Sequence, residues 1–151
     1  MIAIVRVRGT VNVRRDVAET LKRLNLKKPN YCVVVPETKP YLGMIQKVKD
    51  YVAYGDIDLE TFKKLLKRRG EVKGLGKLSG ENVKKLGFDS IDELAEALYS
   101  GKISFKDVPQ LKRFFRLRPP SKGYKSVKKP YPEGALGNWG SNISSLINRM
   151  L

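Results

Sequence analysis

Three short apolar runs in the first 57 residues constrain the fold of this chain more than any other feature. The runs lie at residues 2–7, 31–35 and 51–57, and β-branched or aromatic residues dominate each of them. Such runs are typical of β-strands. Arg6 and Arg8 interrupt the first run, so we expect this strand to bury one face only.

Between these runs, apolar residues recur at the spacing of an amphipathic helix. The first such stretch, with Asn12 as its expected cap, contains Val13, Val17, Leu21 and Leu24. Pro40 favours the start of a second helix, whose expected apolar face contains Tyr41, Met44 or Ile45, Val48 and Val52. The sequence therefore predicts a small α+β fold, with a β-α-β-α-β core over residues 1–57 in which two helices cover the apolar side of one small sheet.

Residues 58–108 are predicted to form a helical region. Asp58 is a suitable cap for a helix that ends near Gly70, and Ser90 with Glu93 makes a capping box for another that ends at Gly101. Residues 79–88 fit a short helix between them. The glycine-rich residues 74–80 match neither a Walker loop nor a dinucleotide fingerprint, so we interpret them as a flexible connector.

The pattern changes again after residue 108. Over residues 109–118, Phe115 and Leu117 alternate with Phe114, Arg116 and Arg118, which predicts an additional strand with a basic face. Residues 119–140 have no periodicity and contain several prolines and glycines, which is typical of an extended segment. A C-terminal helix is predicted over residues 141–151, with its apolar positions at Ile143, Leu146, Ile147 and Met150.

Positive charge is concentrated towards the C-terminal end of the chain. The 151 residues contain 31 Lys and Arg and 15 Asp and Glu, for a formal net charge of +16. Residues 101–151 alone hold eleven basic and two acidic side chains. A surplus of this size predicts a polyanionic partner such as nucleic acid or an anionic membrane surface.

Composition also narrows the possible chemistry. The chain has no histidine, which excludes His-based catalytic triads and His-containing metal sites. Its one cysteine, Cys32, lies in an apolar run, which indicates a buried thiol and suits a reducing compartment. The acidic pairs lie at turns or helix starts, where capping explains them. We therefore expect no catalytic residue, cofactor, metal or small-molecule substrate, and no membrane partner in a protein of the cytoplasm.

The segment from Gln110 to Trp139 carries the strongest functional pattern. Arginine can bind phosphate through two hydrogen bonds and stack on bases, lysine supplies a point charge, and tyrosine or tryptophan offers a face for an unpaired base. No helix with a basic face suited to the major groove of DNA stands out, so RNA is the favoured partner. The candidate RNA-binding residues of this segment are Arg113, Arg116, Arg118, Lys122, Tyr124, Lys125, Lys128, Lys129, Tyr131 and Trp139. Arg14 and Arg15, in the first predicted helix, are further candidates.

Several motifs, in order along the whole chain, resemble a known family. They are the residues LKRLNL from Leu21, CVVVPET from Cys32, LGMIQKVKDYVAYG from Leu42, LLKRRG from Leu65, LRPPSKG from Leu117 and INRM from Ile147. These motifs are similar to large-subunit ribosomal protein L-thirty in its longer archaeal form, whose eukaryotic relative is ribosomal protein L-seven.

The resemblance implies a fold somewhat like that of ferredoxin and a structural, non-enzymatic role on the ribosome. It also implies that the helical region at residues 58–108 is an insertion absent from the short bacterial form. The basic segment from Arg116 to Lys129, together with Lys39 at the turn before the second helix, is then expected to contact rRNA, and neighbouring ribosomal proteins are expected as further partners. Two alternatives remain open. One is a regulator that binds RNA outside the ribosome, and the other is an accessory subunit of an RNA-modifying enzyme.

Overall fold

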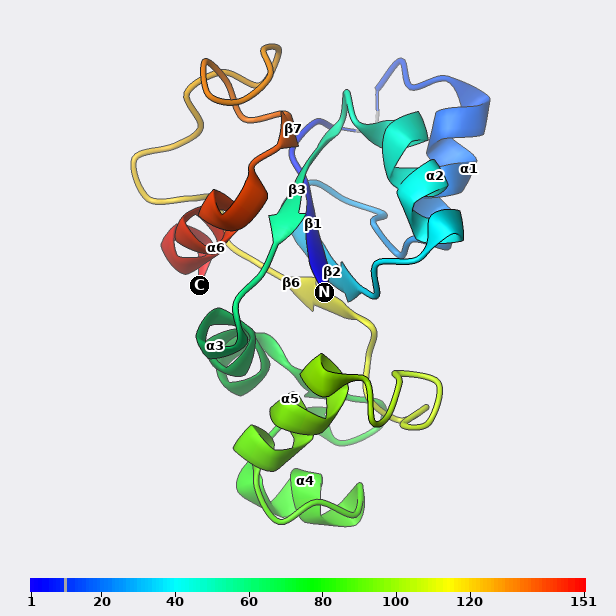
Figure 1. The fold of residues 1–151 in the computed structure, drawn as a ribbon, viewed down its shortest axis with the longest axis vertical. Coiled ribbons are helices and arrows are strands. Elements are labelled where there is room, and N and C mark those ends of the chain that lie inside the picture. The colour runs from blue at the N-terminus through cyan, green and yellow to red at the C-terminus, as the bar shows by residue number, and fades with distance from the viewer. Residues whose placement is uncertain (10) are drawn as a thin grey trace.

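A computed structural model describes residues 1–9 and 11–151 of the chain and places a five-stranded sheet at its centre (Figure 1). The strands, in chain order, are β1 (Ile2–Arg6), β2 (Tyr31–Val35), β3 (Val52–Asp56), β6 (Phe114–Arg116) and β7 (Gly137–Asn138). Their order across the sheet is β6-β2-β1-β3-β7. Because β1 is antiparallel to both β2 and β3, it lies between two strands that run parallel to each other. This split β-α-β arrangement confirms the predicted α+β core.

One face of the sheet is covered by α1 (Arg15–Arg23) and α2 (Lys39–Val48). Ile4 and Val33 of the sheet, Leu21 of α1 and Ile45 of α2 are all buried in this layer. The two helices are those that the apolar spacing predicts.

The opposite face of the sheet is also covered, which the sequence analysis did not predict. Here α3 (Leu59–Arg69) and α6 (Ile143–Met150) pack against Ala3, Val5 and Phe115. The expectation that β1 buries a single face is therefore wrong, since all five of its residues are buried. A strand that is apolar at consecutive positions fits a sheet covered on both sides.

Arg6 is the charged residue within this buried strand. Its guanidinium donates to three backbone carbonyls, at 2.7 Å to Leu26, 3.0 Å to Arg8 and 3.2 Å to Gly9. Burial lowers the pKa of Arg6, and the three carbonyls supply the acceptors that a buried guanidinium requires.

The insertion follows the predicted helices, and its caps are as expected. The Asp58 carboxylate accepts from the Thr61 backbone N–H at 2.7 Å, and the Ser90 hydroxyl accepts from that of Glu93 at 3.2 Å. The further elements are α4 (Gly80–Lys85), α5 (Ile91–Ser100) and a hairpin of β4 (Glu71–Val72) and β5 (Gly76–Lys77). This hairpin occupies part of the stretch that we interpreted as a flexible connector. Gly74 and Gly76 have positive φ angles there, which glycine adopts without strain.

Two helix boundaries differ from the prediction. Asn12 does not cap α1, because it lies in a left-handed turn with φ of 57° and the residue at the cap position is Arg14. Val52 does not belong to α2, since the chain turns after Val48 and Val52 pairs with Arg6 as the first residue of β3. Apolar periodicity alone does not mark where a short turn separates a helix from a strand.

The C-terminal part returns to the sheet twice. β6 pairs with β2 as one edge strand, and β7 pairs with β3 as the other, with Gly137 opposite Ala53. A 3-10 turn at Gly140–Asn142 then leads into α6, the terminal helix that the sequence predicts. The sequence analysis missed β7 because Gly and Asn have low strand propensity. The remainder of residues 119–140 is irregular, as expected.

Candidate nucleic-acid interface

Cationic side chains from three parts of the sequence line one groove beside β7, which we call the basic groove. Its volume is about 580 Å³. Its cations are Arg8, Arg14, Lys47, Lys49 and Lys128, and its single carboxylate is Asp50. Tyr51 and Tyr54 also line it, and residues 136–138 form part of its wall. The groove thus combines a strong positive charge with two aromatic rings.

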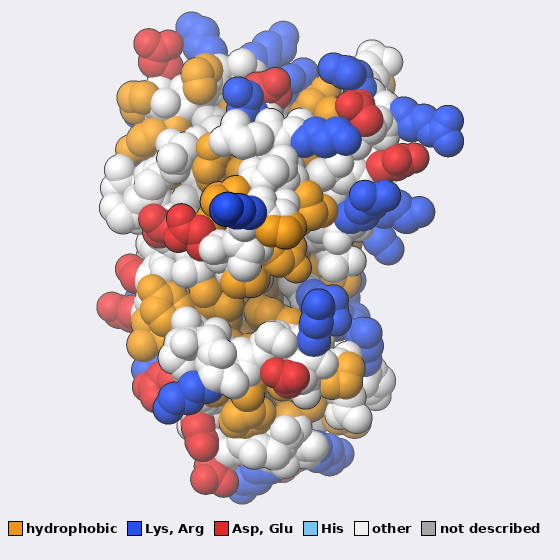
Figure 2. Space-filling model, turned by 45° about the vertical axis from the view of Figure 1, so that its right-hand side comes forward, with side chains coloured by type: hydrophobic (Ala, Val, Ile, Leu, Met, Phe, Trp, Pro, Cys, Tyr) orange, Lys and Arg blue, Asp and Glu red, His pale blue; other side chains and the backbone are white. Residues whose placement is uncertain are grey.

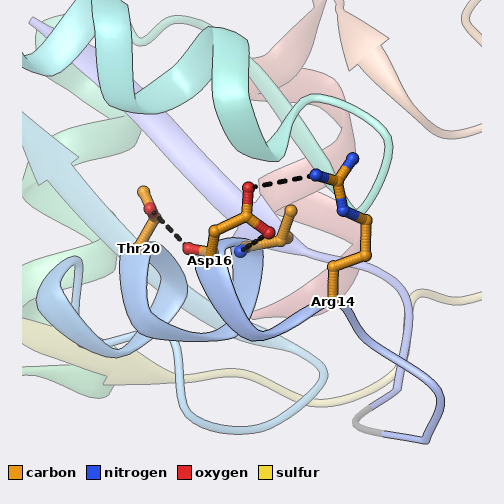
Figure 3. A network of polar contacts seen from close by, with 4 residues as sticks. Arg14, Asp16 and Thr20 are labelled. Atoms are coloured by element: carbon orange, nitrogen blue, oxygen red, sulfur yellow. Dashed lines mark hydrogen bonds and ion pairs between the residues drawn. The ribbon is translucent and has the colours of Figure 1, made fainter.

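Two arginines of the groove are held by neighbouring side chains. The Arg8 guanidinium lies 5.0 Å from the centroid of the Tyr51 ring, a distance at which a cation and an aromatic face attract each other. Arg14 lies next to the start of α1, where its Nη2 is 3.4 Å from the Asp16 carboxylate (Figure 3). The other oxygen of this carboxylate accepts from the Val17 N–H at 2.9 Å, so Asp16 also satisfies a free donor of the first helical turn. The Arg14 side chain remains 80% exposed and accessible to an anion.

The lysines of the groove come from the C-terminal end of α2 and from the irregular segment. Lys47 lies in the last turn of α2, Lys49 follows the helix, and both are exposed. Lys128 approaches from the other wall. In the view of Figure 2, lysine and arginine side chains gather on the upper part of the molecule, which carries α1 and α2. Exposed cations from separate elements can bind several phosphates of one strand at once.

On the other side of the same segment lies a second hollow, which we call the aromatic hollow. It has a volume of about 330 Å³, and its lining includes Tyr124, Lys125, Tyr131, Trp139 and Arg149. The rings of Tyr131 and Trp139 stack with their centroids 4.5 Å apart. The Trp139 indole N–H donates to the Ala135 carbonyl at 2.9 Å, which fixes the ring. A fixed aromatic pair beside two cations is suited to an unpaired base and its phosphate.

Tyr124 serves to anchor the segment to the body of the protein. Its hydroxyl donates to the Asn30 side-chain oxygen at 2.8 Å. Burial raises the pKa of Tyr124 to about 12, against a small opposing effect of Arg149. The ring is therefore less available for base stacking than the sequence predicts.

At the opposite edge of the sheet, the predicted arginines are engaged within the protein. Arg116 donates to the Glu71 carboxylate at 2.7 Å, and Lys112 donates to the same oxygen at 2.9 Å. Both hydrogen bonds lower the pKa of Glu71, and the one that Arg116 donates raises the pKa of Arg116. Arg118 donates to the backbone carbonyl of Leu151 and so holds the C-terminal end of the chain.

The other candidates do not join either hollow. Arg113 borders an apolar hollow of about 360 Å³ that also contacts Leu24 and Phe105, seen between the upper part of the molecule and the insertion in Figure 2. Arg15 pairs with Glu19 at 3.6 Å on the surface of α1. Three exposed lysines of the predicted set stand apart from these contacts, and they are Lys39, Lys122 and Lys129. Lys39 lies at the start of α2, so the length of the helix separates it from Lys47.

Four cations of the two hollows were not among the predicted residues, namely Arg8, Lys47, Lys49 and Arg149, and neither were Tyr51 and Tyr54 of the groove. Arg149 is the single charged residue of α6, so no local pattern marks it. Lys47 and Lys49 resemble ordinary solvated residues at a helix end. A signal was available for Arg8, because it follows a strand that has an apolar residue at nearly every position.

The described residues show little that would support metal binding, thiol chemistry or a membrane-spanning helix. No three of the Cys, Asp and Glu side chains in residues 1–9 and 11–151 are grouped in a way that could hold a metal ion. Cys32 is fully buried, and this burial raises the pKa of its thiol to about 12, so the reactive thiolate is disfavoured. No helix within the described part of the chain has the length and apolar character needed to cross a membrane.

Comparison with known proteins gives a consistent result over the full chain. Residues 2–52, which run from β1 to the first residue of β3, match the model of the family described as ribosomal protein L30p/L7e. The chain is 52% identical to the large ribosomal subunit protein uL30 of Archaeoglobus fulgidus over 151 residues, with 99% of each chain covered. It is 49% identical to uL30 of Methanocorpusculum labreanum over 152 residues, again with 99% of each chain covered. It is also 49% identical to uL30 of Nanoarchaeum equitans, with 99% of this chain and 97% of that relative covered. The chain therefore belongs to the ribosomal protein L30p/L7e family.

Proposed function

We propose that this protein is a structural constituent of the large ribosomal subunit and that it binds folded rRNA through the basic groove and the aromatic hollow. The observation that carries this proposal is the basic groove itself, in which five cations face a single carboxylate. The name of the archaeal relatives, large ribosomal subunit protein, supports the assignment to the subunit. The ribosome of the cytoplasm is the corresponding location, and neighbouring ribosomal proteins are the corresponding protein partners.

Binding follows from the chemistry of the two hollows. The lysines and arginines of the groove replace counterions along the phosphate backbone, which supplies affinity without dependence on base sequence. Arg8 and Arg14 can each give two parallel hydrogen bonds to one phosphate. On the far side of the segment, the Tyr131–Trp139 pair offers an exposed ring face to an unpaired base. The protein thus holds RNA on both sides of residues 128–139.

We assign no enzymatic step to this chain. Among the described residues, carboxylates such as Asp58, Glu71 and Asp92 are engaged in a helix cap or in ion pairs. These interactions account for their positions in the fold without a role in proton transfer. The protein therefore contributes stability to the RNA fold.

Salt dependence tests the proposal most directly. If the full chain makes about six phosphate contacts, its affinity for purified archaeal large-subunit rRNA falls by hundreds-fold or more between about 50 and 200 mM salt. Filter binding measures this dependence. A response that is flat across this range would contradict the proposal.

Substitution of the groove lysines tests whether the groove is the RNA-binding site. We expect the combined change Lys47→Gln, Lys49→Gln and Lys128→Gln to lower the salt slope by about two to three units, because each lost phosphate contact removes 0.7 to 0.9. The matched control Lys84→Gln, Lys85→Gln and Lys102→Gln removes the same charge from exposed positions of the insertion. Equal effects of the two triple variants would show that net charge matters and that the groove does not.

Sedimentation separates the ribosomal role from that of a free RNA-binding regulator. A ribosomal constituent stays with the large subunit when the cell extract is washed at high salt. Recovery of the protein mainly in the light, free fraction would favour the regulator.

A further inference from the structure

A third basic hollow lies at the opposite edge of the sheet from the basic groove, and we call it the arginine hollow. It has a volume of about 480 Å³ and is formed where the end of α3, the β4–β5 hairpin and β6 meet. Its cations are Arg68, Arg69, Lys77 and Arg116, and Gly70 and Glu71 complete its lining. The insertion supplies all of these residues except Arg116.

The charge of the arginine hollow is far from balanced. Glu71 is its one carboxylate, and the same oxygen of that carboxylate accepts from both Arg116 at 2.7 Å and Lys112 at 2.9 Å. No ion pair to Arg68, Arg69 or Lys77 occurs among the residues that the structure describes. A single shared carboxylate cannot neutralise so many cations, so the hollow attracts a further anion.

One atom of a residue that lines the hollow also lacks a partner. The Nε of Arg69 is buried and has no hydrogen-bond acceptor within the described part of the chain. A buried donor without an acceptor is costly, and such groups in folded proteins call for a ligand, an ion or a water molecule. Helix C-termini attract cations, which explains the position of Arg68 and Arg69 in the last turn of α3. That attraction does not supply an acceptor for Arg69 Nε.

We propose that the arginine hollow binds a backbone phosphate of an RNA segment separate from the one in the basic groove. A phosphate offers several acceptor oxygens to guanidinium groups that converge from α3 and β6, and arginine is the side chain best suited to that geometry. RNA is the favoured source because this inference rests on the proposed function, in which the protein already binds RNA at the other edge. The two edge strands are four strand spacings apart, or roughly 19 Å. A protein that binds at both edges holds two RNA segments together.

Tethered hydroxyl-radical cleavage tests the inference and separates it from the proposed function. The chain has a single native cysteine, and burial with a raised pKa makes Cys32 inert towards a maleimide reagent. An iron chelate can therefore be attached to Lys77→Cys in the arginine hollow, to Lys49→Cys in the basic groove, and to Lys84→Cys on α4 as a control. Each protein is bound to purified archaeal large-subunit rRNA, and in parallel is incorporated into large subunits.

We expect cleavage from both Lys77→Cys and Lys49→Cys, at two distinct sets of nucleotides, and weak cleavage from Lys84→Cys. Cleavage from Lys49→Cys alone would overturn the inference and leave the proposed function intact. If neither Lys77→Cys nor Lys49→Cys gives cleavage, the result counts against both the inference and the proposed function. Damage to a neighbouring protein in the subunit, without RNA cleavage from Lys77→Cys, would identify the occupant as an acidic protein segment and also overturn the inference.

Glu71, the single carboxylate of the hollow, provides a second test, in which a substitution is expected to raise the affinity for RNA. Glu71→Gln removes the internal competitor for Arg116 and Lys112, so we expect the affinity of the full chain for the same rRNA to rise severalfold. Arg68→Gln with Arg116→Gln lowers the affinity at least tenfold, whereas Lys84→Gln with Lys85→Gln changes it less than twofold. Thermal melting of each variant checks that the fold is kept. A purely structural role of Glu71 predicts unchanged or lower affinity for Glu71→Gln, and that result would overturn the phosphate assignment.

Discussion

The helical insertion and the irregular segment at residues 119–140 differ in whether their lysines are paired with carboxylates. Residues 58–108 contain eleven basic and nine acidic side chains, whereas residues 119–140 contain four lysines and one glutamate. In the insertion, Lys63 pairs with Glu96 at 2.8 Å and Lys67 pairs with Asp92 at 3.0 Å, and both pairs join α3 to α5. Within the described residues, no ion pair involves residues 119–140.

This difference distinguishes charges that organise the fold from charges that serve a partner. In the insertion, the three lysines of α3 are paired with carboxylates, whereas no ion pair among the described residues involves Arg68, Arg69, Lys84 or Lys85. The lysines of the irregular segment are left for an external anion, and Lys125 and Lys128 border the two hollows that we assign to RNA. Counting lysines and arginines does not separate the two cases, but counting their carboxylate partners does.

The two regions also differ in how they are attached to the rest of the protein. Phe62, Leu65 and Leu94 bury the insertion in the core that lies on one face of the sheet. The irregular segment buries fewer side chains in this core, namely Ala135 and Leu136. It is also attached through hydrogen bonds, such as that from Tyr124 to Asn30, and through the short strand β7. The following predictions test how far this contrast holds, from the largest expected effect to the smallest.

Removal of a core side chain should affect the insertion most. Phe62 is fully buried in the core beside Tyr99, with the two ring centroids 6.3 Å apart. We expect Phe62→Ala to lower the free energy of unfolding by about 3 to 5 kcal/mol, as measured in urea. Val127→Ala in the irregular segment is the control, because its side chain is exposed and such changes stay within about 0.5 kcal/mol. Similar losses for the two variants would contradict the contrast.

Removal of charge should affect RNA binding more in the irregular segment than on α3. We expect Lys125→Gln, Lys128→Gln and Lys129→Gln together to weaken rRNA binding roughly a hundredfold near 0.1 M salt, with little change in melting temperature. The matched control is Lys63→Gln, Lys64→Gln and Lys67→Gln in α3, where each lysine already has a carboxylate partner. A control that weakens binding as strongly would show that paired lysines also contact RNA.

Removal of one hydroxyl should loosen the irregular segment. Tyr124→Phe loses the hydrogen bond to Asn30, and we expect it to lower the free energy of unfolding by about 1 kcal/mol. Faster amide exchange over residues 122–136 should accompany this change. Unchanged exchange there would show that Tyr124 does not anchor the segment.

The same tyrosine has a distinct pH dependence. Its folded pKa of about 12 lies above the ordinary value of 10.0, so the stability that it contributes is fully present below pH 10 and is lost as the pH rises towards 12. Ultraviolet titration should find one late tyrosine among the seven of the chain, and it should be absent from Tyr124→Phe. An unchanged late step in that variant would assign it to another tyrosine.

Much of the fold could be predicted from local pattern. The limits of α3 follow from Asp58 as a cap and from Gly70 after its last turn, and the terminal helix follows from the spacing of Ile143, Leu146 and Ile147. β7 could not be predicted in this way, since Gly137 and Asn138 form a strand only because β3 offers an edge with which they pair. The sheet that is covered on both faces has the same kind of cause, because α3 and α6 come from distant parts of the chain.

The candidate site was less accessible from sequence than the fold. Lys128, Tyr131 and Trp139 could be chosen from the basic and aromatic composition of one segment. Arg8 and Lys49 join the same groove from other elements, and no spacing along the chain relates them to Lys128. Arg116 matched the predicted pattern, but its ion pair with Glu71 depends on a contact across 45 residues.

The amino-acid sequence by itself determined the helices, the main strands, the surplus of positive charge and the absence of histidine chemistry, because these depend on residue type and on spacing within a few turns. Only the tertiary structure decided which cations share a groove, which are matched by carboxylates, and which aromatic rings keep a free face. Electrostatic attraction and ring stacking act between atoms a few ångströms apart in space. The distance between two residues along the chain does not set that separation.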